Sequence, residues 1–504
     1  MISQDDVIYF VFTDRFHAPG KNGSEPYHPN RFFGGNFEGI AQKAAYLAQL
    51  GITAVWISPV YVNIGIGETD PYHYYWALDF DRVDPHLYRK KKGYAMGDKR
   101  YLRDLVTTLQ QHGIKTVLDM VVNHCGYGAR EHFPADWFNT GEGDPTTEQS
   151  LAGLPDFNHD HPDVVDFFIN NILDWIEATG IAGIRMDTAK HVEGRFWRAF
   201  KAQVKGRHHD ITLIGEVLYQ NKAEIAEIAK FQRDFDFDTM FDFPLCNGLI
   251  NTLINDAPMT QLARPRLNDD EEKGVLDIDN PDTGGYTNAS RLVTLLDNHD
   301  LEQRIMSHAR QKHPGENGKT MAYQVVELCL TGLFTMRGIP SLYYGTEVGL
   351  EGWRDESGDA GLRRPFPWYL IDKKTNRPLP DTLEGRLWER TQSLISLCKN
   401  TPGVRYGNTY TLWSDATAYV FLRYFRDSLA LCVFNNGYAA REWSVPVFRH
   451  ANKQDQILPD RVMDLLEQND LQEYTNPDDT VRLAGSALAL RAPGKTAKVY
   501  VPDE

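Results

Sequence analysis

Carboxylates follow short apolar, strand-like runs at three places in the chain. Asp187 and Glu216 each come directly after such a run, and Asp300 ends the segment DNHD after a third. A strand interior of Val, Leu, Ile and Met normally excludes charge, because burying an unpaired carboxylate is costly. Carboxylates at the ends of several strands therefore indicate a site at the mouth of a barrel.

The chemistry that these acids could do depends on their neighbours. Arg185 and Asp187 share a face of their predicted strand, and a nearby guanidinium favours the ionised carboxylate that a covalent nucleophile requires. Glu216 follows apolar residues, which raise the pKa of a carboxyl group and suit a general acid. Each feature alone has a simpler explanation. Arg185 and Asp187 could be a structural ion pair, Glu216 could be a solvated surface residue, and Asp300 could cap the N-terminus of a helix. Together they match retaining glycoside hydrolysis, which uses two carboxyl groups about 5–5.5 Å apart.

A repeating unit predicts how these residues are positioned. Apolar residues at helical spacing in Gly39–Leu50, Tyr101–Gln111 and Val164–Thr179 are each followed by a Gly-Ile pair and an apolar run. Helix, glycine stop and buried strand form the repeating step of a parallel sheet. Eight such strands favour a closed (β/α)8 TIM barrel, an α/β fold, over an open doubly wound sheet. The predicted strands are Val7–Phe12, Ala54–Ile57, Val117–Val122, Gly183–Met186, Thr212–Val217, Asp238–Phe243, Arg291–Leu296 and Ile339–Tyr344.

Two stretches depart from this rhythm. Residues 125–160 are rich in Gly, Pro and acids without a clear helix, which predicts an irregular insertion after the third strand. Residues 401–504 change to short β-type runs and predict a C-terminal antiparallel β-sandwich domain. The barrel would then comprise residues 1–124 and 161–400. The C-terminal strands predicted are Thr409–Trp413, Ala418–Tyr424, Leu429–Phe434 and Ala497–Val501.

Composition limits the partners and the compartment. The 504 residues include 53 Lys and Arg against 69 Asp and Glu, a net charge of −16, which disfavours nucleic acid. Five cysteines without a CxxC pair disfavour a disulfide framework or a zinc site. No apolar run has membrane-spanning length, and Met1–Asp6 leads directly into a strand-like run. We expect a cytoplasmic protein without a membrane partner, and the oligomeric state stays open.

Four motifs, in order, resemble the signature regions of the α-amylase family of retaining glycoside hydrolases (glycoside hydrolase family 13). They are DMVVNH (Asp119–His124), GIRMDTAKH (Gly183–His191), GEV (Gly215–Val217) and DNHD (Asp297–Asp300). The resemblance continues in TDRF (Thr13–Phe16), YHYYWALDFDRVDPH (Tyr72–His86), LPDF (Leu154–Phe157) and GIPSLYYGTE (Gly338–Glu347). It spans roughly residues 7 to 365, and the family also implies the C-terminal β domain.

The resemblance implies a role for each site residue. Asp187 would be the nucleophile, Glu216 the general acid/base and Asp300 the acid that stabilises the distorted sugar in the transition state. The implied substrate-binding residues are His73, Tyr75, Trp76, His124, Arg185, Lys190, His191, His299, Asp359 and Arg363, with Asp355 as an alternative to Asp359. One structural Ca²⁺ would be held by the Asn123 side chain, Asp156 and the His191 carbonyl, together with an acid from the insertion, for which Glu142 and Asp144 are candidates.

The expected function is hydrolysis of α-1,4-glucosidic bonds in starch, glycogen or maltodextrins through a covalent glycosyl-enzyme intermediate. Thr188 and the Lys190-His191 pair resemble α-1,4-acting members more than branch-cleaving ones. A 4-α-glucanotransferase or other transglycosylase, a cyclomaltodextrinase or a glucoside isomerase would use the same three acids. A non-catalytic carbohydrate-binding protein on the same fold is the alternative from another class.

Overall fold

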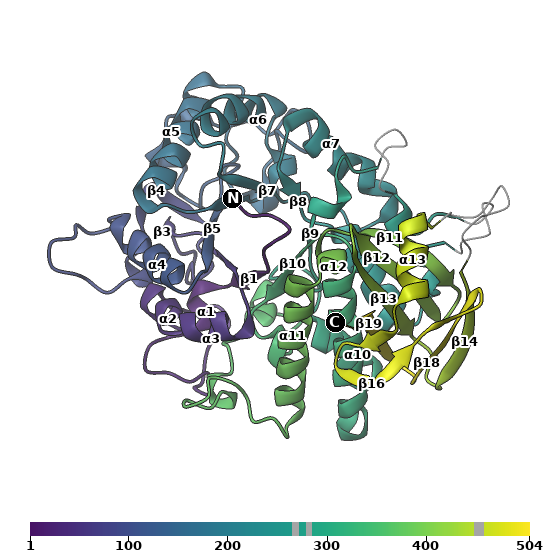
Figure 1. Cartoon of the computed structure of the whole chain (residues 1–504). Coiled ribbons are helices and arrows are strands. Elements are labelled where there is room, and N and C mark those ends of the chain that lie inside the picture. Colours follow the sequence, from purple (N-terminus) through teal and green to yellow (C-terminus); the bar gives the residue numbers. More distant parts are fainter. Residues whose placement is uncertain (265–271, 279–284, 448–457, 504) are drawn as a thin grey trace.

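The computed structural model describes residues 1–264, 272–278, 285–447 and 458–503. A ring of parallel strands surrounded by helices lies beside a separate group of antiparallel strands from the C-terminal part of the chain (Figure 1). This is the α/β barrel with a C-terminal β domain that the sequence predicts. Among the described helices, none is long and apolar enough to cross a membrane.

Eight parallel strands form the barrel sheet in the order β8-β7-β6-β5-β2-β1-β10-β9. An isolated parallel bridge between Phe241 and Val293, beside β8 and β9, joins its two edges and closes the ring. The backbone N–H of Asp242 also donates to the carbonyl of Val293 at 2.9 Å. The strands are β1 (Ile8–Val11), β2 (Ala54–Ile57), β5 (Lys115–Met120), β6 (Gly183–Met186), β7 (Thr212–Gly215), β8 (Thr239–Met240), β9 (Val293–Thr294) and β10 (Ile339–Tyr343).

All eight predicted barrel strands are present, but β8 and β9 are two residues long, much shorter than Asp238–Phe243 and Arg291–Leu296. Helices connect the strands on the outside of the ring, as a parallel sheet requires. They are α1 (Thr13–Phe16), α2 (Phe37–Gln42), α3 (Ala44–Leu50), α4 (Arg100–Gln111), α5 (Pro162–Thr179), α6 (Gly194–Phe200), α7 (Ile225–Phe235), α8 (Phe243–Leu249), α9 (Ile305–Lys312), α10 (Gly315–Thr335) and α11 (Leu383–Asn400).

Glycine ends the helices where the sequence predicts it. Gly51 after α3 and Gly180 after α5 adopt the left-handed conformation, with φ of 100° and 72°. That conformation strains residues with a Cβ atom. The predicted helix Gly39–Leu50 is divided into α2 and α3, because Lys43 leaves helical geometry at φ −106° and ψ 5°.

Two excursions extend the barrel at the ends of β2 and β5. The strands β3 (Tyr61–Asn63) and β4 (Ala77–Val83) form an antiparallel pair that the sequence analysis did not predict. Residues 125–160, all of them described, contain three short 3-10 turns and neither an α-helix nor a strand. Bridges of His124 with Asp156 and of Phe138 with Phe157 fold this insertion back onto the end of β5.

The C-terminal region packs two antiparallel sheets around its own apolar core. Six strands form one sheet in the order β11-β12-β13-β19-β15-β16, and three form the other in the order β14-β18-β17. The four predicted strands are confirmed, and the others and α13 were missed. The elements are α12 (Pro402–Tyr406), β11 (Asn408–Ser414), β12 (Ala418–Phe425), β13 (Ser428–Asn435), β14 (Arg441–Pro446), α13 (Asp460–Gln468), β15 (Leu471–Glu473), β16 (Asn476–Val481), β17 (Leu483–Ala484), β18 (Ala487–Ala492) and β19 (Thr496–Pro502).

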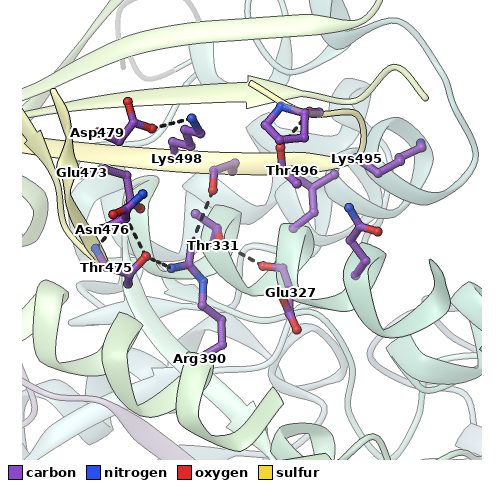
Figure 2. Close-up of a pocket in the computed structure, with 14 residues that line it drawn as sticks. Glu327, Thr331, Arg390, Glu473, Thr475, Asn476, Asp479, Lys495, Thr496 and Lys498 are labelled. Carbon is purple, nitrogen blue, oxygen red and sulfur yellow. Dashed lines mark hydrogen bonds and ion pairs between the residues drawn. The ribbon is translucent and has the colours of Figure 1, made fainter. Parts of the chain in front are cut away.

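A polar groove of about 510 Å³ lies between the barrel helices α10 and α11 and the strands of the β domain (Figure 2). Arg390 of α11 reaches across it and donates to the Thr475 hydroxyl at 3.5 Å and the Ala497 carbonyl at 3.4 Å. At one end, the fully buried Lys495 binds Asp256 of the barrel and donates to the Asn436 side chain at 2.9 Å. Polar contacts therefore join the two parts.

We predict that Asp256→Ala lowers the free energy of unfolding by about 3 kcal/mol or more, because it leaves the buried ammonium of Lys495 without its carboxylate. The matched control is Asp427→Ala, which breaks an ion pair with Arg461 whose two side chains are 73% and 50% exposed. That change should cost less than about 1 kcal/mol. Urea unfolding of the two variants measures the difference, and equal losses would contradict the prediction.

Candidate active site

The three predicted catalytic acids line one pocket of about 460 Å³ at the carboxyl-terminal end of the barrel strands. Asp187 follows β6, Glu216 follows β7 and Asp300 lies in the loop after β9. The pocket also contains every predicted substrate-binding residue except Arg185: His73, Tyr75, Trp76, His124, Lys190, His191, His299, Asp359 and Arg363. Residues far apart in sequence thus meet where the strand ends converge.

Arg185 lies beneath the pocket and contacts three carboxyl groups. Its Nη1 is 2.6 Å from Asp187 Oδ1 and 2.9 Å from Asp119 Oδ1, and its Nη2 is 2.5 Å from Glu216 Oε1. The guanidinium is fully buried, so its planar fork fixes the acids around it. Asp187 and Glu216 are held by the two terminal nitrogens of one group, which keeps them close, as a retaining mechanism needs.

Asp119 anchors the floor of the site, a role that the sequence analysis did not assign. Its carboxylate accepts hydrogen bonds from Trp56 Nε1 at 3.0 Å and from the Tyr75 hydroxyl at 2.8 Å. The Tyr75 oxygen is also 2.7 Å from Nε2 of His299. Complete burial raises the pKa of the Asp119 carboxyl to about 8, against the opposing effect of Arg185.

Glu216 has the environment of a general acid. Its side chain is buried, and burial raises the pKa of its carboxyl to about 7, reinforced by the charges of Asp187 and Asp300 and opposed by Arg185. Its Oε2 accepts a hydrogen bond at 3.0 Å from the backbone N–H of Thr188. Near neutral pH, the Glu216 carboxyl can therefore hold a proton and donate it.

Asp300 is oriented by two neighbouring side chains. Its Oδ2 is 3.1 Å from His299 Nε2, and its Oδ1 accepts a hydrogen bond at 3.0 Å from Arg363 Nη2. Burial lowers the pKa of His299 well below its usual value, so the ring is neutral. Arg363 Nη2 also binds Asp359 at 3.2 Å, whereas Asp355 bonds to Ser357 and does not line the pocket.

Aromatic rings line one wall of the pocket. The rings of Tyr75 and His299 stack at a centroid distance of 5.4 Å, and His73 meets Trp76 edge-on at 4.4 Å. Rings presented in this way can cover the apolar face of a sugar. Leu151 and Leu154 of the insertion add apolar surface to the same pocket.

Lys190 and His191 follow β6, on the side of Glu216. Lys190 Nζ donates to the carbonyl of Leu218 at 3.2 Å, which links the loops after β6 and β7. His191 Nδ1 is 2.7 Å from the carbonyl of Thr146 and thereby ties the insertion to the pocket. Burial lowers the pKa of both side chains.

Several residues of the site were missed by the sequence analysis. Asp119 stands in a motif that had been noted, so its position was a usable signal, whereas nothing in the local sequence singles out Leu151 or Leu218. Arg354 lies in the segment Gly352–Gly361, which is unusually rich in charged residues. Its guanidinium belongs to the pocket wall.

Two of the residues predicted to bind Ca²⁺, Asn123 and Asp156, lie together near the end of β5. The Oδ1 atom of Asn123 is buried and has no hydrogen-bond partner among the described residues. Asp156 is buried beside it and accepts a hydrogen bond from Asn139 at 2.7 Å, and burial raises its carboxyl pKa to about 7. In the described part of the chain, no three His, Cys, Asp or Glu side chains gather as a metal-binding group.

Comparisons with known proteins agree with this geometry. The family described as alpha amylase, catalytic domain, matches residues 10–146 and 136–379. A cyclomaltodextrinase of Thermoanaerobacter pseudethanolicus is 26% identical over 467 residues, which cover 86% of this chain and 70% of the relative. An intracellular maltogenic amylase of Bacillus subtilis is 26% identical over 375 residues, which cover 69% of this chain and 56% of the relative. The crystal structure of the Geobacillus thermoleovorans α-amylase complexed with acarbose has a TM-score of 0.78 at 27% identity, over 100% and 99% of the chains.

The barrel and its acid-lined pocket define a retaining glycoside hydrolase. The chain belongs to the α-amylase family, and its substrates are α-glucans. The resemblance, the fold class and the enzyme class expected from the sequence are confirmed.

We predict that kcat/KM for glucan hydrolysis falls as the pH rises through about 7, because Glu216 must carry the proton and loses it above that pKa. Asp300→Asn should move this decline to lower pH, since it removes a negative charge that raises the pKa of Glu216. Initial rates on maltoheptaose between pH 5 and 9 measure both effects. A profile that stays flat to pH 9 would contradict the assignment.

Proposed function

We propose that the protein hydrolyses α-1,4-glucosidic bonds of starch, glycogen or maltodextrins, with Asp187 as nucleophile and Glu216 as general acid/base. The observation that carries this proposal is the shared guanidinium of Arg185, which binds Asp187 at 2.6 Å and Glu216 at 2.5 Å. Both acids are paired with this cation, and burial raises the pKa of Glu216 to about 7, so that its carboxyl can hold the proton that the reaction requires.

In the first step, the Glu216 carboxyl donates its proton to the glucosidic oxygen while Asp187 Oδ attacks the anomeric carbon. The bond from that carbon to the leaving oxygen breaks, and a glycosyl ester on Asp187 forms. In the second step, Glu216 accepts a proton from water, the water oxygen attacks the anomeric carbon, and Asp187 leaves as a carboxylate. Two inversions give net retention of the α configuration.

The other residues would bind and orient the sugar. Asp300, held by His299 and Arg363, would grip hydroxyl groups of the distorted ring. Tyr75 would stack beneath the same ring, with its hydroxyl fixed by Asp119. His73, Trp76, His124 and Asp359 would contact sugars on the same side, and Lys190 and His191 those on the leaving-group side.

A second candidate activity is hydrolysis of cyclomaltodextrins. It is favoured by the similarity to the cyclomaltodextrinase of Thermoanaerobacter pseudethanolicus. Transfer to a sugar acceptor would use the same intermediate. Faster hydrolysis of β-cyclodextrin than of amylose would favour the cyclomaltodextrinase activity. Products longer than the maltoheptaose substrate would reveal transfer to a sugar acceptor.

A cytoplasmic location is supported by the Bacillus subtilis relative, which is named as intracellular. The five cysteines are all buried and free, as they would be in a reducing compartment.

One structural Ca²⁺ is also part of the proposal. Asn123 offers a buried amide oxygen without a partner, and Asp156 a buried carboxylate of raised pKa, so the pair suits a hard cation that prefers oxygen. The His191 carbonyl would be a third ligand, and the His191 side chain contacts the insertion at the carbonyl of Thr146. The ion would neutralise Asp156 and fix the insertion against the barrel. Asp144, a candidate for a further ligand, instead caps its own turn at Thr146.

Asp187→Asn should lower kcat on maltoheptaose by at least about 10⁴-fold, because the amide cannot act as the covalent nucleophile. Unfolding of the variant should match the wild type within about 1 kcal/mol, which distinguishes loss of chemistry from loss of fold. For the wild type, proton NMR of the first product should show the α anomer. Undiminished cleavage by the variant, or a β anomer, would refute the mechanism.

Chelation with EGTA should lower the melting temperature of the wild type, and added Ca²⁺ should restore it, because an ion bound only by the folded state stabilises that state. Asp156→Asn should remove most of this response. The control is Asp144→Asn, which alters an exposed acid of the same insertion and should retain it. An unchanged melting temperature in EGTA would rule out the ion.

A further inference from the structure

Two loops at the rim of the pocket are joined along their backbones. The N–H of Arg354 donates to the carbonyl of Glu302 at 2.9 Å, and the N–H of Arg304 donates to the carbonyl of Gly352 at 2.8 Å. Gln303 and Trp353 form an antiparallel bridge between these contacts. The loop after β9 and the loop after β10 therefore form one continuous wall.

The side chain of Arg354 lies across this wall on its pocket side. Its Nε donates to Asp359 Oδ1 at 2.7 Å, its Nη1 to Glu302 Oε1 at 2.9 Å, and its Nη2 to the carbonyl of Asp300 at 2.8 Å. Three hydrogen bonds, one to a backbone carbonyl of the wall and two to side chains on both loops, would have to break for this side chain to leave. The neighbouring Trp353 does not line the pocket, and the guanidinium of Arg364 lies 4.6 Å from the centre of its exposed ring.

The position of Arg354 relative to Glu216 indicates which end of a bound glucan would face this wall. Glu216 must face the leaving group, and Lys190 and Leu218 lie on its side, after β6 and β7. Arg354 follows β10, which lies four strands from β6 in either direction around the closed ring. A chain that crosses the pocket with its leaving group at Glu216 points its non-reducing end toward Arg354.

We infer that Arg354 closes the non-reducing side of the pocket, so that the enzyme binds glucans from their ends and releases short products of one dominant size. This inference rests on the proposed hydrolase function and specifies its substrate. A bulky group on the terminal glucose meets the ion-paired guanidinium. A cyclic glucan has no end to place there, so the closed wall also favours linear over cyclic substrates.

The test compares maltoheptaose glycosides with a free non-reducing end and with that end capped by a 4,6-O-ethylidene group. Wild-type enzyme should cleave the capped substrate about 10-fold more slowly or worse, the scale of a poorly accommodated group in a binding pocket. Arg354→Ala should bring the two rates together and give longer, more varied products. Glu302→Ala, which removes one hydrogen-bond partner of the guanidinium, should change the ratio of the two rates and the product lengths in the same direction as Arg354→Ala.

The matched control is Arg441→Ala, which removes an arginine of similar exposure, ion-paired to Asp415 in the β domain. It should keep the wild-type preference for the free end. Equal cleavage of the two substrates by the wild type would overturn the inference and leave the hydrolase function standing. A wild-type enzyme that cleaves neither substrate would instead refute the proposed function.

Discussion

One buried cation sets the electrostatics of the catalytic centre. Arg185 is surrounded by the carboxyl groups of Asp119, Asp187 and Glu216, all within ion-pair distance. A single positive charge cannot neutralise three negative charges in a space closed to water, so retaining protons costs less than ionising every acid. Burial is the main cause of the raised pKa values of Asp119 and Glu216, and the neighbouring carboxylates add to it while Arg185 opposes it. The buried cluster around Arg185 thus favours a protonated Glu216, which the proposed mechanism requires.

The barrel and its loops contribute different things to the site. The strand ends fix Arg185, Asp187 and Glu216 through the ladder hydrogen bonds of β6 and β7, and these positions serve any glucan. The loops after β9 and β10, with Arg354 between them, shape what lies beyond the bond to be cut. In the proposed mechanism, chemistry and substrate length would therefore be controlled by separate segments, which would allow one to change without the other.

The features that follow a hydrophobic period or a sequence motif could be predicted from the sequence. Apolar strands, glycine stops and the four acid-bearing motifs predicted the barrel and the residues of its pocket. The strand β16 was missed because its sequence, NPDDTV, contains proline and two acids, which an edge strand tolerates and a pattern search rejects. The linking roles of Asp119 and Arg354 could not be predicted, because each depends on partners brought from distant strands and loops.

The seam of the barrel gives the three acids unequal support. The strands β8 and β9 are two residues long and meet through a single bridge, whereas β6 and β7 lie within an unbroken run of paired strands. Segments with few backbone hydrogen bonds open most readily. Asp300 follows the short strand β9 at this seam, whereas Asp187 follows β6, which pairs with four residues on each side. In the proposed mechanism, the acid that grips the sugar would thus be free to follow a changing ring pucker at the seam, apart from the pair that makes and breaks the bond.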